Sequence, residues 1–187
     1  MFSKEEGRQL LLLARKSIES YFSKENIDLS KYKKFSKEQG VFVTLNEHDE
    51  LRGCIGFPNP IFPLYKAVFD SARAAAFEDP RFSPVKKGEL ADIVIEISVL
   101  TVPEELKVKK PEEYIERIHI GQDGLIIRGK YASGLLLPQV FIEYPSTPKQ
   151  ALEMTCQKAG LQKDAWKDLS YKVFKFQAQI FSEKEKK

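Results

Sequence analysis

Residues 92–100 carry the clearest periodic signal in the chain. Isoleucine or valine occupies every second position from Ile93 to Val99, which is the two-residue repeat of a strand with one buried face. A helix cannot bury this pattern on one side because its side chains repeat every 3.6 residues. The segment therefore predicts a strand in a sheet that packs against another layer of structure.

Helices and further strands are predicted on both sides of this strand. Apolar residues recur at helical spacing over three segments, residues 3–24, 63–77 and 147–159. Strands are predicted at 40–45 and 51–57, which form a hairpin, and at 118–120, 125–129, 135–137 and 171–181, the last with a bulge near Val173. Helices and strands mixed in this order predict an α+β fold with a mainly antiparallel sheet.

The composition is that of an ordinary folded protein. The chain has 187 residues, of which 42% are hydrophobic and 30% charged, with a net charge of +3. We expect one domain over residues 1–187 whose charged end, 182–187, frays. No apolar run approaches the ~20 residues that cross a bilayer, and the first residues are acidic where a secretion signal is basic. With two cysteines and no disulfide framework, we expect a cytoplasmic protein without a membrane partner.

The segment Leu51–Gly56 is the least ordinary stretch. Gly53 and Gly56 each cost a strand roughly 0.5–1 kcal/mol relative to alanine, which indicates a bulge or a close approach to the backbone. In a regular strand Arg52 and Cys54 share a face about 6.6 Å apart, where the guanidinium would lower the thiol pKa. The alternative is a small buried cysteine with Arg52 in a structural ion pair, and residue chemistry alone favours it.

A nucleophilic cysteine needs a base or another activator. His48 lies in the predicted hairpin turn, roughly 20 Å from Cys54 along an extended strand. His119 lies on a predicted strand that is free to approach Cys54, although its spacing does not require this. Cys156 falls on the apolar side of its helix and is expected in the core. These residues are scattered singly, so no metal-ligand spacing is present.

Two further segments carry candidate site residues. In the loop Asp79–Phe82, Arg81 is able to hold an anion through a two-pronged contact, or Asp79 and Arg81 fasten the loop to the body of the protein. Gln139 follows a buried apolar run, and its amide either bonds backbone in a bend or faces a cleft. The residues alone leave these alternatives open.

Six segments, in this order, resemble the AMMECR family, which is widespread in archaea, bacteria and eukaryotes. They are Leu51–Gly56, the family's signature hexapeptide, followed by Asp79–Phe82, Ser98–Leu100, Gly121–Leu125, Leu136–Val140 and Lys158–Leu161. The resemblance covers nearly the whole chain and is that of a stand-alone archaeal member.

The resemblance implies an α+β unit with a larger and a smaller lobe, and a cleft between them lined by the hexapeptide. It supplies no catalytic residue and no cofactor. The breadth of the family has prompted the suggestion of a role in transcription, replication, repair or translation. Some relatives are fused to, or encoded beside, Memo-like and radical-SAM proteins, which implies a shared modification pathway. The implied partners are therefore a nucleic acid or nucleotide, or those two proteins.

Three functions follow as hypotheses. The first is a binding or adaptor module with an anionic-ligand cleft at Arg52 and Cys54. The second is a thiol-dependent enzyme with Cys54 as its catalytic residue, and the third is a structural interaction partner. The expected ligand-binding residues are Arg52, Gly53, Ile55, Gly56, Asp79, Arg81 and Gln139.

Overall fold

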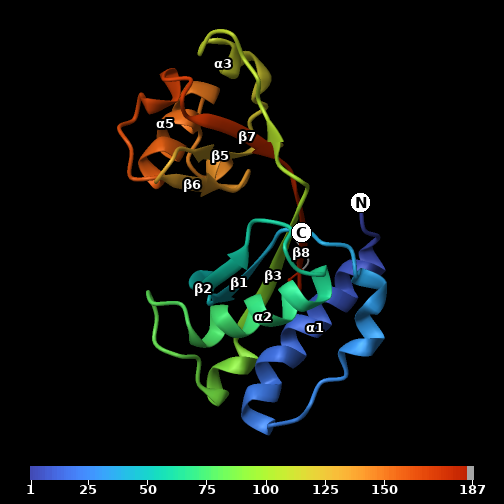
Figure 1. Ribbon diagram of the computed structural model, residues 1–187. Helices are drawn as coiled ribbons and strands as arrows, with labels where there is room; N and C mark the ends of the chain where they lie inside the picture. The colour runs from blue at the N-terminus through green and yellow to red at the C-terminus, as the bar shows by residue number, and fades with distance from the viewer. Residues whose placement is uncertain (185–187) are drawn as a thin grey trace. The chain divides into compact units, whose positions relative to one another are not determined.

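The computed structural model describes residues 1–184, and the chain divides into two compact units (Figure 1). The first unit comprises Met1–Leu100 with the segment that begins at Gln179, and the second comprises Thr101–Ala178. Each unit holds a four-stranded sheet and a hydrophobic core of its own. The α+β fold with antiparallel strand pairing is therefore confirmed.

The sheet of the first unit has the strand order β2-β1-β3-β8, so β2 is an edge strand. Its strands are β1 (Val41–Glu47), β2 (Glu50–Phe57), β3 (Ile93–Leu100) and β8 (Ala178–Ser182). Its helices are α1 (Lys4–Ser23), α2 (Leu64–Phe77) and the 3₁₀ turns η1 (Leu29–Phe35) and η2 (Lys87–Ala91). The alternating apolar residues of β1 and β3 are fully buried in one core with apolar residues of α1 and α2, as the two-residue repeat predicts.

The sheet of the second unit has the order β4-β7-β5-β6. Its strands are β4 (Glu104–Glu105), β5 (Gly124–Arg128), β6 (Ser133–Leu136) and β7 (Lys172–Phe176). Its helices are α3 (Glu113–Arg117), α4 (Val140–Glu143), α5 (Pro148–Lys158) and the 3₁₀ turn η3 (Ala165–Lys167). Leu125, Ile127 and Val173 of this sheet share a core with α5 and the buried Trp166.

Local sequence signals fix the ends of the long helices. Ser3 and Glu6 form a reciprocal capping box at the start of α1, and Thr147 and Gln150 form another at the start of α5. Gly160, just after α5, has φ 72°, the left-handed backbone that glycine adopts without steric cost. The helix starts predicted near residues 3 and 147, and the helix end predicted near residue 159, are confirmed.

Two strand predictions are wrong. Residues 118–119 are irregular instead of a strand and lead into a turn that begins at Ile120, and the His119 N–H donates to the Asp123 carboxylate at 2.9 Å. The single strand predicted at 171–181 divides at Gln177 into β7 and β8, which belong to different sheets. Gln177 exchanges hydrogen bonds with Thr101 through its N–H and its carbonyl, both at 2.9 Å.

The segment expected to fray begins at Ser182, the last residue of β8. β8 runs to Ser182, and the Glu183 N–H donates to the Ile95 carbonyl at 3.0 Å. The Glu183 carboxylate accepts the Ile95 N–H and pairs with Arg15. Glu183 thus contacts both β3 and α1. Residues 185–187 of the predicted tail lie outside the described part of the chain.

Candidate functional site

The hexapeptide lies on the edge strand β2 (Figure 1). Within that strand, Cys54 stands opposite Thr44 of β1. An edge strand leaves every second N–H and C=O without a strand partner. At Cys54 these groups have other partners. Its N–H donates to Asp79 Oδ2 at 2.9 Å, and its carbonyl accepts from Arg81 Nη2 at 3.2 Å. The loop after α2 therefore closes the outer edge of β2 at this residue.

Asp79 and Arg81 form a two-pronged ion pair within that loop. Arg81 donates through Nε to Asp79 Oδ1 at 2.9 Å and through Nη2 to Oδ2 at 2.7 Å. The Arg81 backbone N–H also donates to Oδ1, at 3.1 Å. The Asp79 side chain is 2% exposed, whereas that of Arg81 is 52% exposed. These hydrogen bonds, chiefly those of the guanidinium, hold the pKa of Asp79 far below its ordinary value despite burial.

Arg52 does not take the position expected of it. The register of β2 pairs Gly53 with Leu45 but Leu51 with Asn46, so Arg52 is the extra residue of a β-bulge. The assumption of a regular strand through Arg52 and Cys54 is therefore wrong.

The Arg52 guanidinium belongs to an ion pair. Its Nε donates to Glu89 Oε1 at 2.8 Å and lies 3.9 Å from Glu47, and the side chain is only 12% exposed. The hydrogen bond from Arg52 lowers the pKa of Glu89. The carboxylates of Glu89 and Glu47 therefore already pair with Arg52, the residue expected to activate Cys54 or to bind an anion.

The two glycines of the hexapeptide accommodate the protein's own backbone. A β-carbon on Gly53 would stand 2.2 Å from the Ala75 carbonyl oxygen of α2, and one on Gly56 would stand 2.2 Å from that of Val41. Ile55 packs against the core of the first unit. The close approach that the glycines predict is therefore internal, and it explains their presence without a ligand.

The Cys54 thiol is half-buried and accepts a hydrogen bond from Thr44 Oγ at 3.3 Å. Burial raises its pKa, and this outweighs the opposite effects of Thr44 and of the Arg81 charge. Thr44 also stands opposite Glu96 of β3, so Cys54, Thr44 and Glu96 form one row across three strands. The Glu96 and Asp79 carboxylates raise the thiol pKa further. Burial and the two carboxylates therefore favour the thiol over the thiolate.

The remaining predicted residues lie elsewhere in the chain. Gln139 directly precedes α4 in the second unit, where its carbonyl accepts the N–H groups of Ile142 and Glu143. His119 belongs to the same unit, with Nδ1 3.3 Å from the Asp123 carboxylate. His48 lies in the β1–β2 turn at φ 53°. Within residues 1–184, no hydrogen bond joins either histidine to Cys54.

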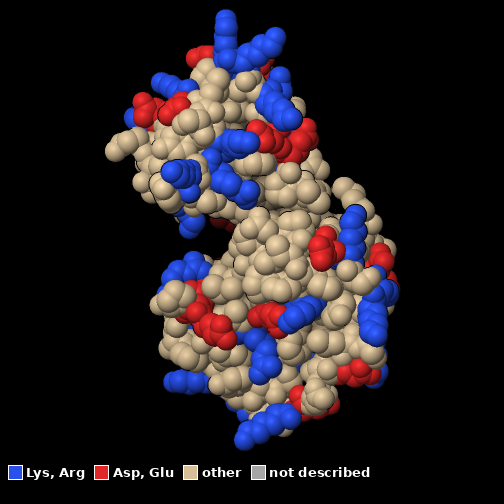
Figure 2. Space-filling model, in the orientation of Figure 1, with Lys and Arg blue, Asp and Glu red and all other residues tan. Residues whose placement is uncertain are grey.

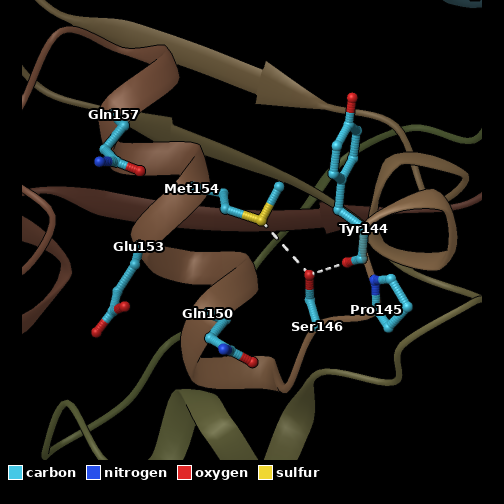
Figure 3. A pocket seen from close by; sticks show the side chains of 7 residues that line it. All are labelled: Tyr144, Pro145, Ser146, Gln150, Glu153, Met154 and Gln157. Atoms are coloured by element: carbon cyan, nitrogen blue, oxygen red, sulfur yellow. Dashed lines mark hydrogen bonds between the residues drawn. The ribbon is translucent and has the colours of Figure 1, made fainter.

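A pocket of about 330 Å³ lies in the second unit, between α5 and the segment Tyr144–Ser146 (Figure 3). Gln150, Glu153, Met154 and Gln157 of α5 complete its lining. Ser146 Oγ donates to the Tyr144 carbonyl and lies 3.4 Å from the Met154 sulfur. The residues predicted for the site do not line this pocket.

Other features of the described residues bear on function. Over residues 1–184, His, Cys, Asp and Glu side chains do not gather in the groups of three that would hold a metal ion. In the same range, every helix is too short or too polar to cross a membrane. Lysine and arginine side chains are interspersed with acidic ones on the visible surface of each unit (Figure 2).

Comparison with known proteins assigns the chain to a family. The family model AMMECR1 matches residues 11–181, so the chain belongs to the AMMECR1 family, and the resemblance carried by the six segments is confirmed. Protein MJ0810 of Methanocaldococcus jannaschii is 46% identical over 97% of this chain and 92% of its own length. A protein of Thermococcus onnurineus is 49% identical over 95% and 90%, respectively.

A solved structure supports the fold. The crystal structure of protein PH0010 from Pyrococcus horikoshii superposes with a TM-score of 0.92 at 44% sequence identity. The match covers 98% of this chain and 94% of the other.

Sequence reasoning missed the side chains that complete the site. Thr44 was identifiable, because counting back from the hairpin turn places it near Cys54. Glu89 and Glu96 carry no local signal, since η2 and β3 meet the β1–β2 hairpin only in the folded unit.

Proposed function

We propose that the chain is a binding module of the cytoplasm in which Arg81 receives an anionic group, a phosphate or a carboxylate, beside Cys54. One observation carries the proposal. The Arg81 guanidinium is held by Asp79 and by the Cys54 carbonyl, yet its side chain is 52% exposed. In the described residues its remaining nitrogen, Nη1, makes no hydrogen bond.

A guanidinium held in this way suits anion binding. Its orientation is set before the ligand arrives, so little side-chain entropy is lost on binding. Arginine nitrogens form short, charge-assisted hydrogen bonds with phosphate and carboxylate oxygens. Because Asp79 balances the charge of Arg81, affinity must come from geometry and from further contacts of the ligand. Arg52 is not part of this proposal, since Glu89 and Glu47 already engage it.

The thiol-enzyme alternative has less support. Burial raises the pKa of Cys54, whereas nucleophilic cysteines need a lowered pKa or an adjacent base. The partners that we propose for the module are those of the family resemblance: a nucleotide or nucleic acid, or Memo-like and radical-SAM proteins. Both cysteines are free thiols, which fits the reducing cytoplasm.

Titration of backbone amide resonances tests the proposal. Inorganic phosphate, acetate and adenosine nucleotides are added to the wild type and to the variants R81Q, R81K and R8Q. We expect saturable shifts at residues 52–56 and 79–82, at least tenfold weaker binding to R81Q and an intermediate effect of R81K. Arg8 is an exposed residue of α1 that pairs with Glu5 at 3.3 Å, so R8Q controls for the loss of charge.

Equal binding by R81Q and R8Q, or shifts that do not saturate in the wild type, would contradict the proposal. Circular dichroism establishes whether each variant is folded, and R81K keeps the test informative if R81Q is not.

A further inference from the structure

The β5–β6 hairpin of the second unit exposes an aromatic ring among positive charges. The hairpin is closed by the Gly129 N–H, which donates to the Ala132 carbonyl at 2.8 Å, and Lys130 and Tyr131 form its tip. Tyr131 is 90% exposed, and Lys130 Nζ lies 5.0 Å from the centre of its ring. Apart from the contact with Lys130, this large aromatic ring is therefore open to solvent.

Two more cations lie next to this tip. Arg128 of β5 stands directly opposite Lys172 of β7, and like charges in that position destabilise a strand pair. The Arg128 guanidinium lies 5.1 Å from the centre of the Phe174 ring, and Lys172 Nζ lies 3.5 Å from Glu105. Three cations, Arg128, Lys130 and Lys172, thus lie at or next to the tip of the hairpin, and Glu105 is the carboxylate that pairs with Lys172.

A second basic cluster, in the first unit, shows what distinguishes this one. Lys31, Lys33 and Lys34 of η1 are all exposed. The aromatic residues between them, Tyr32 and Phe35, are 9% and 2% exposed and pack into the core. In η1 the aromatic rings are buried and the lysine side chains are exposed. At the β5–β6 hairpin the aromatic ring is exposed as well.

We propose that Arg128, Lys130, Tyr131 and Lys172 form a binding surface for single-stranded nucleic acid. The three cations contact backbone phosphates and the Tyr131 ring stacks on a base. Surfaces that bind single strands combine these two elements, and stacking on an aromatic residue contributes strongly for any base. The proposal is independent of the anion site at Arg81, because the surface lies entirely in the second unit.

Fluorescence anisotropy with labelled twelve-nucleotide oligo(U) and oligo(dT) at 50 and 200 mM KCl tests this surface. We expect Y131A to weaken binding about tenfold, since a stacked base is lost, and Y131F to bind within twofold of the wild type. The variant R128Q/K130Q/K172Q should bind more weakly and reduce the salt slope by about 2, at about 0.7 per phosphate contact for single strands. A preference for RNA would show that the 2′-hydroxyl contributes, and equal binding would show that phosphates and stacking suffice.

The variant K31Q/K33Q/K34Q is the matched control, because it removes the same charge from the cluster that lacks an exposed ring. It should bind within about twofold of the wild type. The proposal is overturned if this control loses as much affinity as R128Q/K130Q/K172Q or if Y131A binds like Y131F. Absence of binding by the wild type, or displacement of the oligonucleotide by poly-glutamate at equal charge concentration, would also overturn it.

Discussion

The buried carboxylate of Asp79 accepts the backbone N–H of Cys54 at 2.9 Å. Asp79 lies in the loop after α2, and Cys54 lies on the edge strand of the sheet. Two separate sequence motifs are therefore joined by hydrogen bonds in the folded protein. Arg81 of the same loop donates a hydrogen bond to the Cys54 carbonyl. The pair occupies both backbone groups at a position where another strand could otherwise add.

Removal of the Asp79 charge should weaken the first unit. D79N loses the charge-assisted bonds from Arg81 and Cys54, and we expect a cost of about 2–4 kcal/mol in the free energy of unfolding. This figure allows for the partial exposure of Arg81. Urea unfolding followed by circular dichroism measures it. The control is D70N on α2, whose carboxylate pairs with Lys66 at the surface and should change stability by no more than about 0.5 kcal/mol. Equal costs for the two variants would show that the Asp79 contacts do not stabilise the fold.

The stability of the wild type should also depend on pH through Asp79. Its pKa in the folded state lies far below the ordinary value of 3.8. The stabilisation is therefore complete above the unfolded pKa and is lost as pH falls below about 4 toward the lowered folded pKa. The stability difference between wild type and D79N should be constant from pH 5 to 7 and shrink between pH 4 and 2.5. The pKa of Glu89 is also lowered. Because Glu89 is present in both proteins, its contribution cancels in the stability difference. A difference that does not change with pH would contradict this assignment.

The Cys54 thiol should react slowly at neutral pH. Burial raises its pKa above the ordinary value of 9.0, and thiolate is the reactive form. In a C156S background, the rate of alkylation by iodoacetamide should rise with pH and have its midpoint above 9. T44V should move the midpoint higher, because the Thr44 hydrogen bond opposes the effect of burial. A midpoint below 8 would restore the thiol-enzyme hypothesis.

Substitution of Gly53 tests the internal explanation of the glycines. In G53A the new methyl group would stand 2.2 Å from the Ala75 carbonyl oxygen, so α2 must move away from the sheet. We expect a loss of about 1–3 kcal/mol in unfolding free energy. G88A, with no other atom within 4 Å of the added carbon, should leave stability unchanged or slightly higher. If G53A were as stable as G88A, the helix and strand would not be in the close contact described.

Periodicity and end signals predict most of the fold because they act within one element. The alternation at 93–99 places β3, and the capping pairs at Ser3 and Thr147 place two helix starts. Periodicity does not predict that the last strand divides at Gln177. Both halves have strand-like sequences, and the hydrogen bonds between Gln177 and Thr101 lie where the strand is interrupted.

The candidate site is less predictable because its geometry is tertiary. The unusual residues of both motifs stand out in the sequence, but nothing local shows that Asp79 reaches Cys54. The sequence also gives no sign of the bulge at Arg52. Because of that bulge, the prediction of a regular strand through Arg52 and Cys54 fails. The partners of Arg52 and Cys54 come from η2, β1 and β3, which sequence spacing does not relate to β2.

Amide hydrogen exchange at Cys54 tests most directly whether Asp79 and Arg81 hold the outer edge of β2. Cys54 N–H points away from β1, so Asp79 alone accounts for any slowing of its exchange in the native state. We predict strong protection in the wild type. In D79A, which removes the acceptor oxygens, exchange at Cys54 should be about 100-fold faster, whereas Gly53 and Ile55, whose N–H groups point toward β1, should change only by the global loss of stability. A Cys54 amide that exchanges in the wild type as fast as in an unfolded peptide would contradict the account.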